Sequence, residues 1–317
     1  MKRFFFIAVF LMIALVGIYG FVWSIRKDSI NSIHSDVQSG NPGKLHVTAS
    51  FYPLYFFAER IGGDKAEVAN IVPSGAEPHD YEPTAQDMAR MEKSDLIILN
   101  GGGFEAWGDR IERNIRTEDT VIVMAGDSLM TRETSGDDSL TTDPHIWIDP
   151  VLARTMAQNI ARGFEQVDPE NAKYYRENTS VLLAGLADLD AAYRGGLQVC
   201  ATRNIITSHS AFGYLAAEYG LNQVSIAGLS PDAEPSPAQL AQIAQFAKTN
   251  NVQYIFFESL ASPKLSQTIA TEVGAKTLVL NPIEGLSGEE ISQGEDYFSV
   301  MRENLVNLQT ALQCNQK

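Results

Sequence analysis

The 317-residue sequence is poor in basic residues, cysteine and short catalytic motifs, and each scarcity narrows the possible functions. It has 24 lysines and arginines against 39 aspartates and glutamates, a net charge of -15, which argues against nucleic acid as a partner. An acidic surface attracts cations, although it also serves solubility alone. Neither Gly-x-Gly-x-x-Gly nor a Walker spacing accompanies the glycine triplet 101–103, so we expect a turn there and no phosphate site.

Only two cysteines, Cys200 and Cys314, are present. Two thiols are too few for a cysteine zinc cage and are the right number for one disulfide in an oxidising compartment. Such a bond would tie the last turn of the chain to the start of its second half. Two free buried thiols are the alternative, which an export signal makes less favourable.

The N-terminus has the pattern of an export signal or a membrane anchor. Met1-Lys2-Arg3 is basic, and residues 4–23 form an uncharged apolar run about as long as a membrane-spanning helix. No small-x-small cleavage site follows and no cysteine lies near to accept a lipid, so we predict an uncleaved anchor over residues 1–23. Residues 24–44 are polar and aperiodic, which predicts a flexible tether. With the N-terminus inside, the folded body would be extracytoplasmic, in the periplasm or on the outer face of the membrane.

From Leu45 onward, short apolar runs alternate with helical patterns, which predicts an α/β fold of parallel sheets flanked by helices. We expect strands at residues 45–50, 66–72, 95–100, 120–124, 204–207, 254–257 and 277–280. We expect helices at residues 53–61, 84–93, 168–196, 211–219 and 297–312, and further helices that begin at about residues 150, 237 and 263. Capping patterns support helix starts at Thr84, Asp149, Ser236 and Ser262, so Asp149 is interpreted as a cap and not a ligand.

The most regular helix pattern runs from Asp168 to Gly196, with apolar residues at alternating spacings of three and four. Because it lies near the middle of the chain, we predict that residues 168–196 link an N-terminal lobe, 45–167, to a C-terminal lobe, 197–317. An ordinary helix within a single domain is the alternative.

Three of the five histidines fall in loops at strand ends or helix starts. His79 lies in a loop stiffened by prolines, His145 directly follows Pro144, and His209 lies between a strand and a helix. Glu284 occupies a fourth loop of this kind. A ligand set divided between two lobes would place a metal in the cleft between them. Imidazole and carboxylate groups suit tetrahedral zinc, whereas manganese prefers a more oxygen-rich set of ligands.

Each of the acidic residues near these histidines could either support a metal site or serve another role. Glu77, Asp80 and Glu82 could attract cations or orient an imidazole, although solvated loop charges are more common. Glu258 directly follows a predicted strand and could orient a ligand or be a rival ligand. Trp147 is interpreted as a packing residue.

The local sequences around the four candidates closely resemble the metal-site segments of the zinc-type solute-binding proteins of bacterial metal ABC transporters. The segments are GAEPHDYEP at 75–83, DPHIWIDP at 143–150, TSHSAFGY at 207–214 and LNPIEGL at 280–286. Residues 231–236 and the region 100–107 are also similar to that family, and the likeness runs in order from about Leu45 to the C-terminus. It implies two α/β lobes around a long helix, with zinc bound between them and handed to a membrane permease.

Carried over to this sequence, the resemblance implies metal ligation by His79, His145 and His209, with Glu284 or a water in the fourth place. Manganese-type relatives typically have Glu at the position of His209, so this histidine favours zinc. The sequence departs from the family at residues 131–142, a short segment without histidine where many zinc-type members have a long His-rich loop. The lipid-bearing or cleavable signal that is common in the family is also not evident.

The sequence therefore predicts a monomeric, extracytoplasmic protein that captures zinc and delivers it to an ABC permease, and not an enzyme. Manganese binding by the same fold is the first alternative. A zinc hydrolase is the second, because three histidines and an open fourth position can activate water. The lack of a recognisable general base and the division of the ligands between two lobes argue against a hydrolase.

Overall fold

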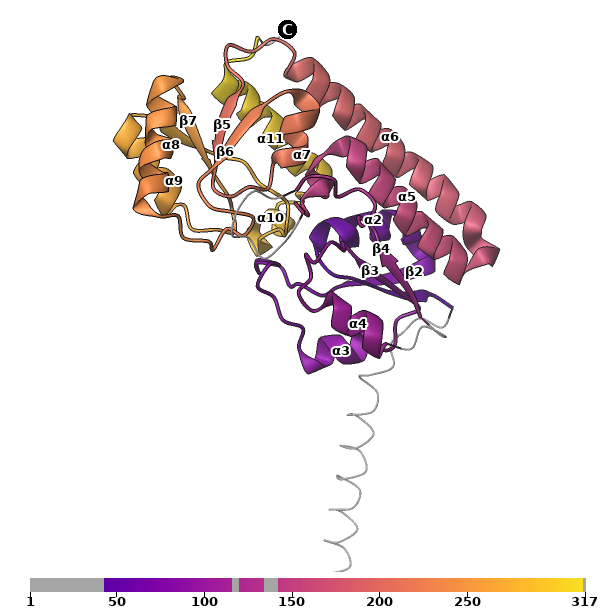
Figure 1. The fold of residues 1–317 in the computed structure, drawn as a ribbon. Coiled ribbons are helices and arrows are strands. Elements are labelled where there is room, and N and C mark those ends of the chain that lie inside the picture. The colour runs from indigo at the N-terminus through magenta and orange to yellow at the C-terminus, as the bar shows by residue number, and fades with distance from the viewer. Residues whose placement is uncertain (1–42, 116–119, 134–141, 316–317) are drawn as a thin grey trace, which may run out of the picture. The chain divides into compact units, whose positions relative to one another are not determined.

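Two four-stranded parallel sheets organise the protein (Figure 1), whose computed structural model describes residues 43–115, 120–133 and 142–315. The first sheet contains β1 Leu45–Ala49, β2 Ala66–Asn70, β3 Leu96–Leu99 and β4 Val121–Met124, in the order β2-β1-β3-β4. The second contains β5 Asn204–Thr207, β6 Asn222–Ser225, β7 Tyr254–Phe257 and β8 Lys276–Val279, in the order β6-β5-β7-β8. The two halves therefore repeat one strand order, and the predicted α/β fold is confirmed.

All six strand pairs are parallel, so the carboxyl ends of the strands meet at one edge of each sheet. In open α/β sheets this edge is where ligands bind. Loops that follow β2, β5 and β8 carry His79, His209 and Glu284. The topology alone thus brings these three predicted ligands to the carboxyl edges of the two sheets.

Helices follow most strands and cover the sheets (Figure 1). In the first half they are α2 Tyr52–Gly62, α3 Ala85–Met91, α4 Gly108–Asn114 and α5 Pro150–Val167, and α6 Ala172–Gly196 follows. In the second half they are α7 Gly213–Tyr219, α8 Pro237–Thr249, α9 Lys264–Val273, α10 Gly288–Ser292 and α11 Tyr297–Leu312. Short 3-10 turns occur at η1 Gly63–Lys65, η2 Ile146–Ile148 and η3 Pro169–Asn171.

Three of the predicted helix caps are confirmed and one is wrong. Thr84 and Ser236 form reciprocal capping boxes, and the side chain of Asp149 accepts a hydrogen bond from the backbone of Val151. Ser262 does not cap α9, because Pro263 already has helical dihedral angles and occupies the cap position without a side-chain bond. The strand β6 and the helices α4 and α10 were not predicted, since their sequences are short and largely polar.

The long helix α6 contacts elements of both halves. It packs against α2 and α5, which precede it in the chain, and against α11, which follows it. Its buried face follows the predicted spacing of three and four, with these residues buried: Tyr175, Thr179, Leu182, Leu186, Leu189 and Tyr193. Asp168 opens the 3-10 turn η3 by accepting from Asn171, so the α-helix itself begins at Ala172, later than the sequence pattern suggests.

The largest cluster of buried side chains includes residues from both halves. Phe56 of α2 stacks on Tyr297 of α11 with ring centroids 5.8 Å apart, and Phe57 meets the same tyrosine edge-on at 5.0 Å. Aromatic pairs at these distances add stabilisation beyond the area they bury. The two sheets therefore share one apolar core, and a smaller cluster lies around Ile243 and Ile269 of α8 and α9.

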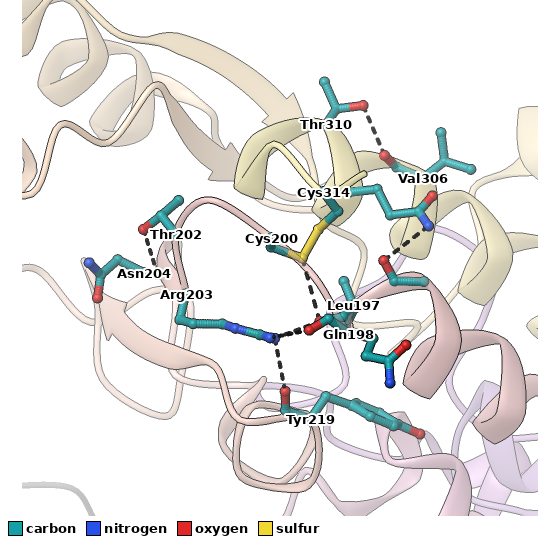
Figure 2. The surroundings of a disulfide bond; sticks show 12 residues. Leu197, Gln198, Cys200, Thr202, Arg203, Asn204, Tyr219, Val306, Thr310 and Cys314 are labelled. Atoms are coloured by element: carbon teal, nitrogen blue, oxygen red, sulfur yellow. Dashed lines mark hydrogen bonds between the residues drawn. A yellow bond between two sulfur atoms is a disulfide. The ribbon is translucent and has the colours of Figure 1, made fainter. Parts of the chain in front are cut away.

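Cys200 and Cys314 are joined by a disulfide across 114 residues, as predicted (Figure 2). The chain segments around the two cysteines also pair as backbone, because Ala201 donates to Leu312 and Asn315 donates to Val199, both at 3.0 Å. Close by, the guanidinium group of Arg203 donates to the carbonyl of Leu197 at 2.6 Å. The end of α11 is thus fastened to the segment that follows α6.

Within the described part of the chain, no helix combines the length and apolarity that crossing a membrane requires. The predicted anchor, residues 1–23, lies outside the described residues, as does almost all of the predicted tether at 24–44.

Candidate metal centre

The four side chains predicted as ligands meet at one point, with their ligand atoms within 4.8 Å of one another. Oε1 of Glu284 lies 3.3 Å from Nε2 of His79 and 3.2 Å from Nε2 of both His145 and His209. Nε2 of His145 is 3.3 Å from Nε2 of each other histidine. A regular tetrahedron with bonds of about 2.0 Å, the zinc–nitrogen length, has edges of about 3.3 Å. Five of the six edges of this cage therefore match tetrahedral zinc.

Two hydrogen bonds fasten the loops of His79 and Glu284 to each other. The backbone N–H of Gly75 and the hydroxyl of Ser74 both donate to the carbonyl of Leu286, at 3.0 and 2.6 Å. Ser74 follows β2 and Leu286 follows β8, so the contact joins the two sheets directly beside the cage. The cage is thus closed in this structure.

Carboxylates hold two of the three imidazole rings in place. Nδ1 of His145 lies 2.8 Å from Asp143, and Nδ1 of His209 lies 2.7 Å from Glu258. When Nδ1 of a neutral imidazole donates a hydrogen bond, Nε2 keeps its lone pair. Both lone pairs then face the centre of the cage from fully buried side chains. Such carboxylate–histidine pairs are typical of metal sites, where they fix the ring and raise its basicity.

Glu258 was weighed above as a rival ligand, and the structure places it behind His209 instead. The same oxygen also accepts from the backbone N–H of His209, at 3.2 Å. Asp143 is held in a similar way, because it accepts from the backbone N–H of His145 at 3.0 Å and lies 3.8 Å from the guanidinium group of Arg132. Each carboxylate therefore orients both the ring and the main chain of one histidine.

The electrostatics of the cage favour a positive charge at its centre. Burial alone would raise the pKa of Glu284, but charge on His209 and His79 holds that pKa well below its usual value. Burial likewise opposes charge on His209, yet Glu258 and Glu284 outweigh it and raise the pKa of His209 well above its usual value. At His79 burial prevails and lowers the pKa. Three imidazole nitrogens and a carboxylate oxygen at these distances can bind a divalent cation in place of a proton.

The three acidic residues near His79 differ in their surroundings. Glu77 is half-buried and accepts from the backbone N–H of His79 at 3.2 Å, and burial together with nearby Glu284 raises its pKa to about 8. Asp80 is exposed, and Glu82 forms an exposed ion pair with Arg110 at 2.5 Å. Only Glu77 therefore acts on the cage, through the main chain of the ligand loop.

Sequence reasoning did not assign Asp143, which lies two residues before His145 in the same loop. That spacing lets one carboxylate oxygen accept from both the backbone and the ring of the histidine, and it could have identified the residue. Asn100 was also not assigned a role. Its amide donates to the carbonyl of Pro144 at 3.1 Å and so supports the His145 loop from the end of β3.

A buried cage of three nitrogens and one oxygen, assembled at the strand ends of two similar α/β halves, defines a two-lobed metal-binding protein of the solute-binding class. The family model described as zinc-uptake complex component A, periplasmic, matches residues 47–311. The chain belongs to this family. It is a family of zinc-uptake proteins and not a family of enzymes.

Curated relatives and solved structures agree with this assignment. The high-affinity zinc uptake system protein ZnuA of Bacillus subtilis is 43% identical over 280 residues, which are 85% of this chain and 88% of that protein. The zinc-binding lipoprotein AdcA of Streptococcus pneumoniae is 37% identical over 83% of this chain, which spans only 55% of AdcA. The crystal structure of the Zn(II)-bound ZnuA-like domain of pneumococcal AdcA is similar with a TM-score of 0.75 and 37% identity, covering 85% of this chain and 99% of that domain.

Proposed function

We propose that this protein captures zinc outside the cytoplasm through His79, His145, His209 and Glu284 and delivers it to the permease of an ABC transporter. The observation that carries the proposal is the cage itself, in which five of the six edges, at 3.2 to 3.3 Å, match zinc bound by nitrogen and oxygen. The names of its relatives, which are zinc-uptake and zinc-binding proteins, support the same ion.

In the proposed function, three parts of the chain have different roles in capturing and releasing the ion. Residues 45–167 form a lobe that supplies His79 and His145, residues 197–317 form a lobe that supplies His209 and Glu284, and residues 168–196 link them. Because each lobe holds half of the ligands, separating the lobes would break the cage and free the ion. Packing of α6 against α2, α5 and α11 supports the linking role.

The proposal places the folded body, as a monomer, at the membrane surface. Residues 1–23 would be the anchor and residues 24–44 the tether, as the apolar and polar patterns of these segments predict. The pneumococcal relative is named a lipoprotein, so attachment to a membrane by some means has a parallel among the relatives. Intact mass of the protein extracted from membranes distinguishes an uncleaved anchor from a processed one.

The geometry disfavours a zinc hydrolase. A catalytic zinc site keeps one position open for water, whereas here Glu284 occupies the fourth corner of the cage. Asp143 and Glu258 are engaged with imidazole Nδ1 atoms and are not free to act as a general base, and Glu77 accepts from the backbone N–H of His79.

Zinc titration of the folded body, residues 45–317, tests the proposal. We expect one tight site, severe loss of binding in His145→Ala, and no esterase, peptidase or anhydrase turnover in the zinc-loaded protein. Manganese should compete poorly and should raise the melting temperature less than zinc does. Unchanged zinc binding in His145→Ala, or steady turnover that this substitution abolishes, would refute the proposal.

A further inference from the structure

The loop that presents Glu284 contains a strained residue. Ile283, directly before Glu284, has φ +57 and is fully buried. Among the described residues it is the one β-branched side chain with a positive φ. A left-handed conformation is unfavourable for a residue with a Cβ, and such strain persists only where the surroundings enforce it.

Two buried asparagines of the C-terminal half of the chain hold this conformation in place. The side-chain oxygen of Asn281 accepts from the backbone N–H of Ile283 at 2.8 Å. Asn304 of α11 in turn accepts from the backbone N–H of Asn281 at 2.8 Å and donates to its carbonyl at 2.7 Å. The strained residue is therefore locked to a helix of the core.

Trp147 holds the same loop from the other half of the molecule. Its indole N–H donates to the carbonyl of Pro282 at 2.8 Å, and its own carbonyl accepts from the hydroxyl of Tyr297 at 2.6 Å. The indole ring is fully buried and lies with its centroid 5.2 Å from that of His145. One side chain thus ties the loop of Glu284 to the segment that carries His145.

We infer that Trp147, Asn281 and Ile283 are positioning residues that fix the Glu284 carboxylate at one corner of the cage and thereby make the site select zinc over manganese. This inference rests on the proposed zinc site. A single oxygen, Oε1, faces all three imidazoles at 3.2 to 3.3 Å, which suits four-coordinate zinc. Manganese prefers six ligands and more oxygen, so it needs the carboxylate to turn toward bidentate binding or to admit water. A fixed loop resists both changes.

The test compares two variants that loosen the loop with two matched controls. Trp147→Phe removes the N–H and keeps most of the buried ring, and Trp107→Phe is the same change at a buried tryptophan of another core cluster. Ile283→Gly relieves the left-handed strain, whereas Ile283→Ala loses packing and keeps the strain. The dissociation constants of zinc and manganese are measured by competition with a metal indicator, and the visible spectrum of the Co²⁺ form reports four-coordination.

We expect Trp147→Phe to weaken zinc binding about ten- to one-hundredfold, as loss of an outer hydrogen bond at a metal site does. Ile283→Gly loses no hydrogen bond, but glycine frees the backbone directly before Glu284, so it should weaken zinc binding in the same direction by a smaller factor. The ratio of the manganese to the zinc dissociation constant should fall by a similar factor, and the intense tetrahedral Co²⁺ bands should weaken. Trp107→Phe should keep the wild-type ratio, and Ile283→Ala should stay closer to it than Ile283→Gly does.

An unchanged ratio and Co²⁺ spectrum in both loosened variants would overturn the inference. If His145→Ala still abolished zinc binding in that experiment, the proposed function would stand and only the role of the loop would be wrong. If His145→Ala bound zinc like the wild type, the proposed function itself would fail.

Discussion

His79 of the first half and His209 of the second occupy equivalent places, each in a loop after a strand, but the protein holds them differently. The side chain of His209 is fully buried and its Nδ1 contacts Glu258 at 2.7 Å. The side chain of His79 is 7% exposed, and within the described residues no carboxylate lies at its Nδ1. Burial lowers the pKa of His79, whereas the two glutamates overcome burial and raise that of His209. The ring of His209 is thus held by a carboxylate, whereas the position of His79 depends on its loop.

The largest expected effect is the loss of a ligand. His209→Ala and His79→Ala should each weaken zinc binding on the order of 10²–10³-fold, because one of four bonds to the ion is lost. The two variants should differ in the metal-free protein, where His209→Ala leaves Glu258 and Glu284 buried without their partner and lowers the melting temperature. Calorimetric titration and thermal melts measure both quantities. Negligible loss of zinc binding in His209→Ala would show that the cage is not shared between the halves.

A smaller effect should follow from removing the groups that orient the rings. Glu258→Gln and Asp143→Asn should weaken zinc binding about ten- to one-hundredfold, since an amide is a poorer acceptor for an imidazole N–H than a carboxylate. Glu77→Gln is the matched control. Its carboxyl accepts a hydrogen bond from the main chain of His79 and has a pKa of about 8, so an uncharged amide resembles its state at pH 7. If Glu77→Gln weakened zinc binding as much as Glu258→Gln does, the proposed difference in how the protein holds His79 and His209 would be wrong.

Acidification should weaken zinc binding by about tenfold per pH unit for each proton that the ion displaces. The raised pKa of His209 means that this ring is protonated near neutral pH in the metal-free protein, so zinc must displace that proton. The raised pKa also stabilises the metal-free fold fully below about pH 6.5, the value of a free imidazole, and this contribution is lost as pH rises through the folded value. As pH rises above about 6.5, the metal-free melting temperature should therefore fall while the zinc-induced shift grows.

Scanning calorimetry across this range, with and without zinc, measures both trends. Glu258→Gln should flatten them, because it removes one of the two carboxylates that raise the pKa of His209. A metal-free melting temperature that rose steadily with pH in the wild type would contradict the assigned charge states.

The smallest effect on zinc binding should come from the disulfide. Replacing Cys200 and Cys314 by serine should cost about 2–4 kcal/mol of unfolding free energy, because the bond closes a long loop in the unfolded chain. The zinc dissociation constant should not change, since the bond fastens the end of α11 and contributes no group to the cage. Denaturant unfolding of the zinc-free protein measures the first quantity and titration the second. A weakened zinc site would mean that α11 transmits its position to the loop of Glu284 through Asn304.

Local patterns were sufficient to predict most of the fold. The alternation of apolar runs with capped helices identified the parallel sheets, because the patterns that predict a strand or a helix depend on residues close together in the sequence. The strand β6 was not predicted because its sequence, Asn-Gln-Val-Ser, is largely polar. It forms a strand through its pairing with β5, which the local sequence does not indicate. The Ser262 cap failed for a related reason, because the conformation of Pro263 already supplied the turn.

The sequence by itself determined which groups could bind a metal, since His79, His145, His209 and Glu284 each lie in a short motif at the end of a strand or the start of a helix. Only the tertiary structure decided how they act together. Distances of 3.2 to 3.3 Å between loops separated by 64 to 205 residues depend on the packing of two sheets about a shared core. The placement of Glu258 behind His209, and the bonds by which Asn304 and Trp147 hold the loop before Glu284, likewise arise from contacts across the fold. Such contacts leave no local signal, because they join residues that no sequence window contains.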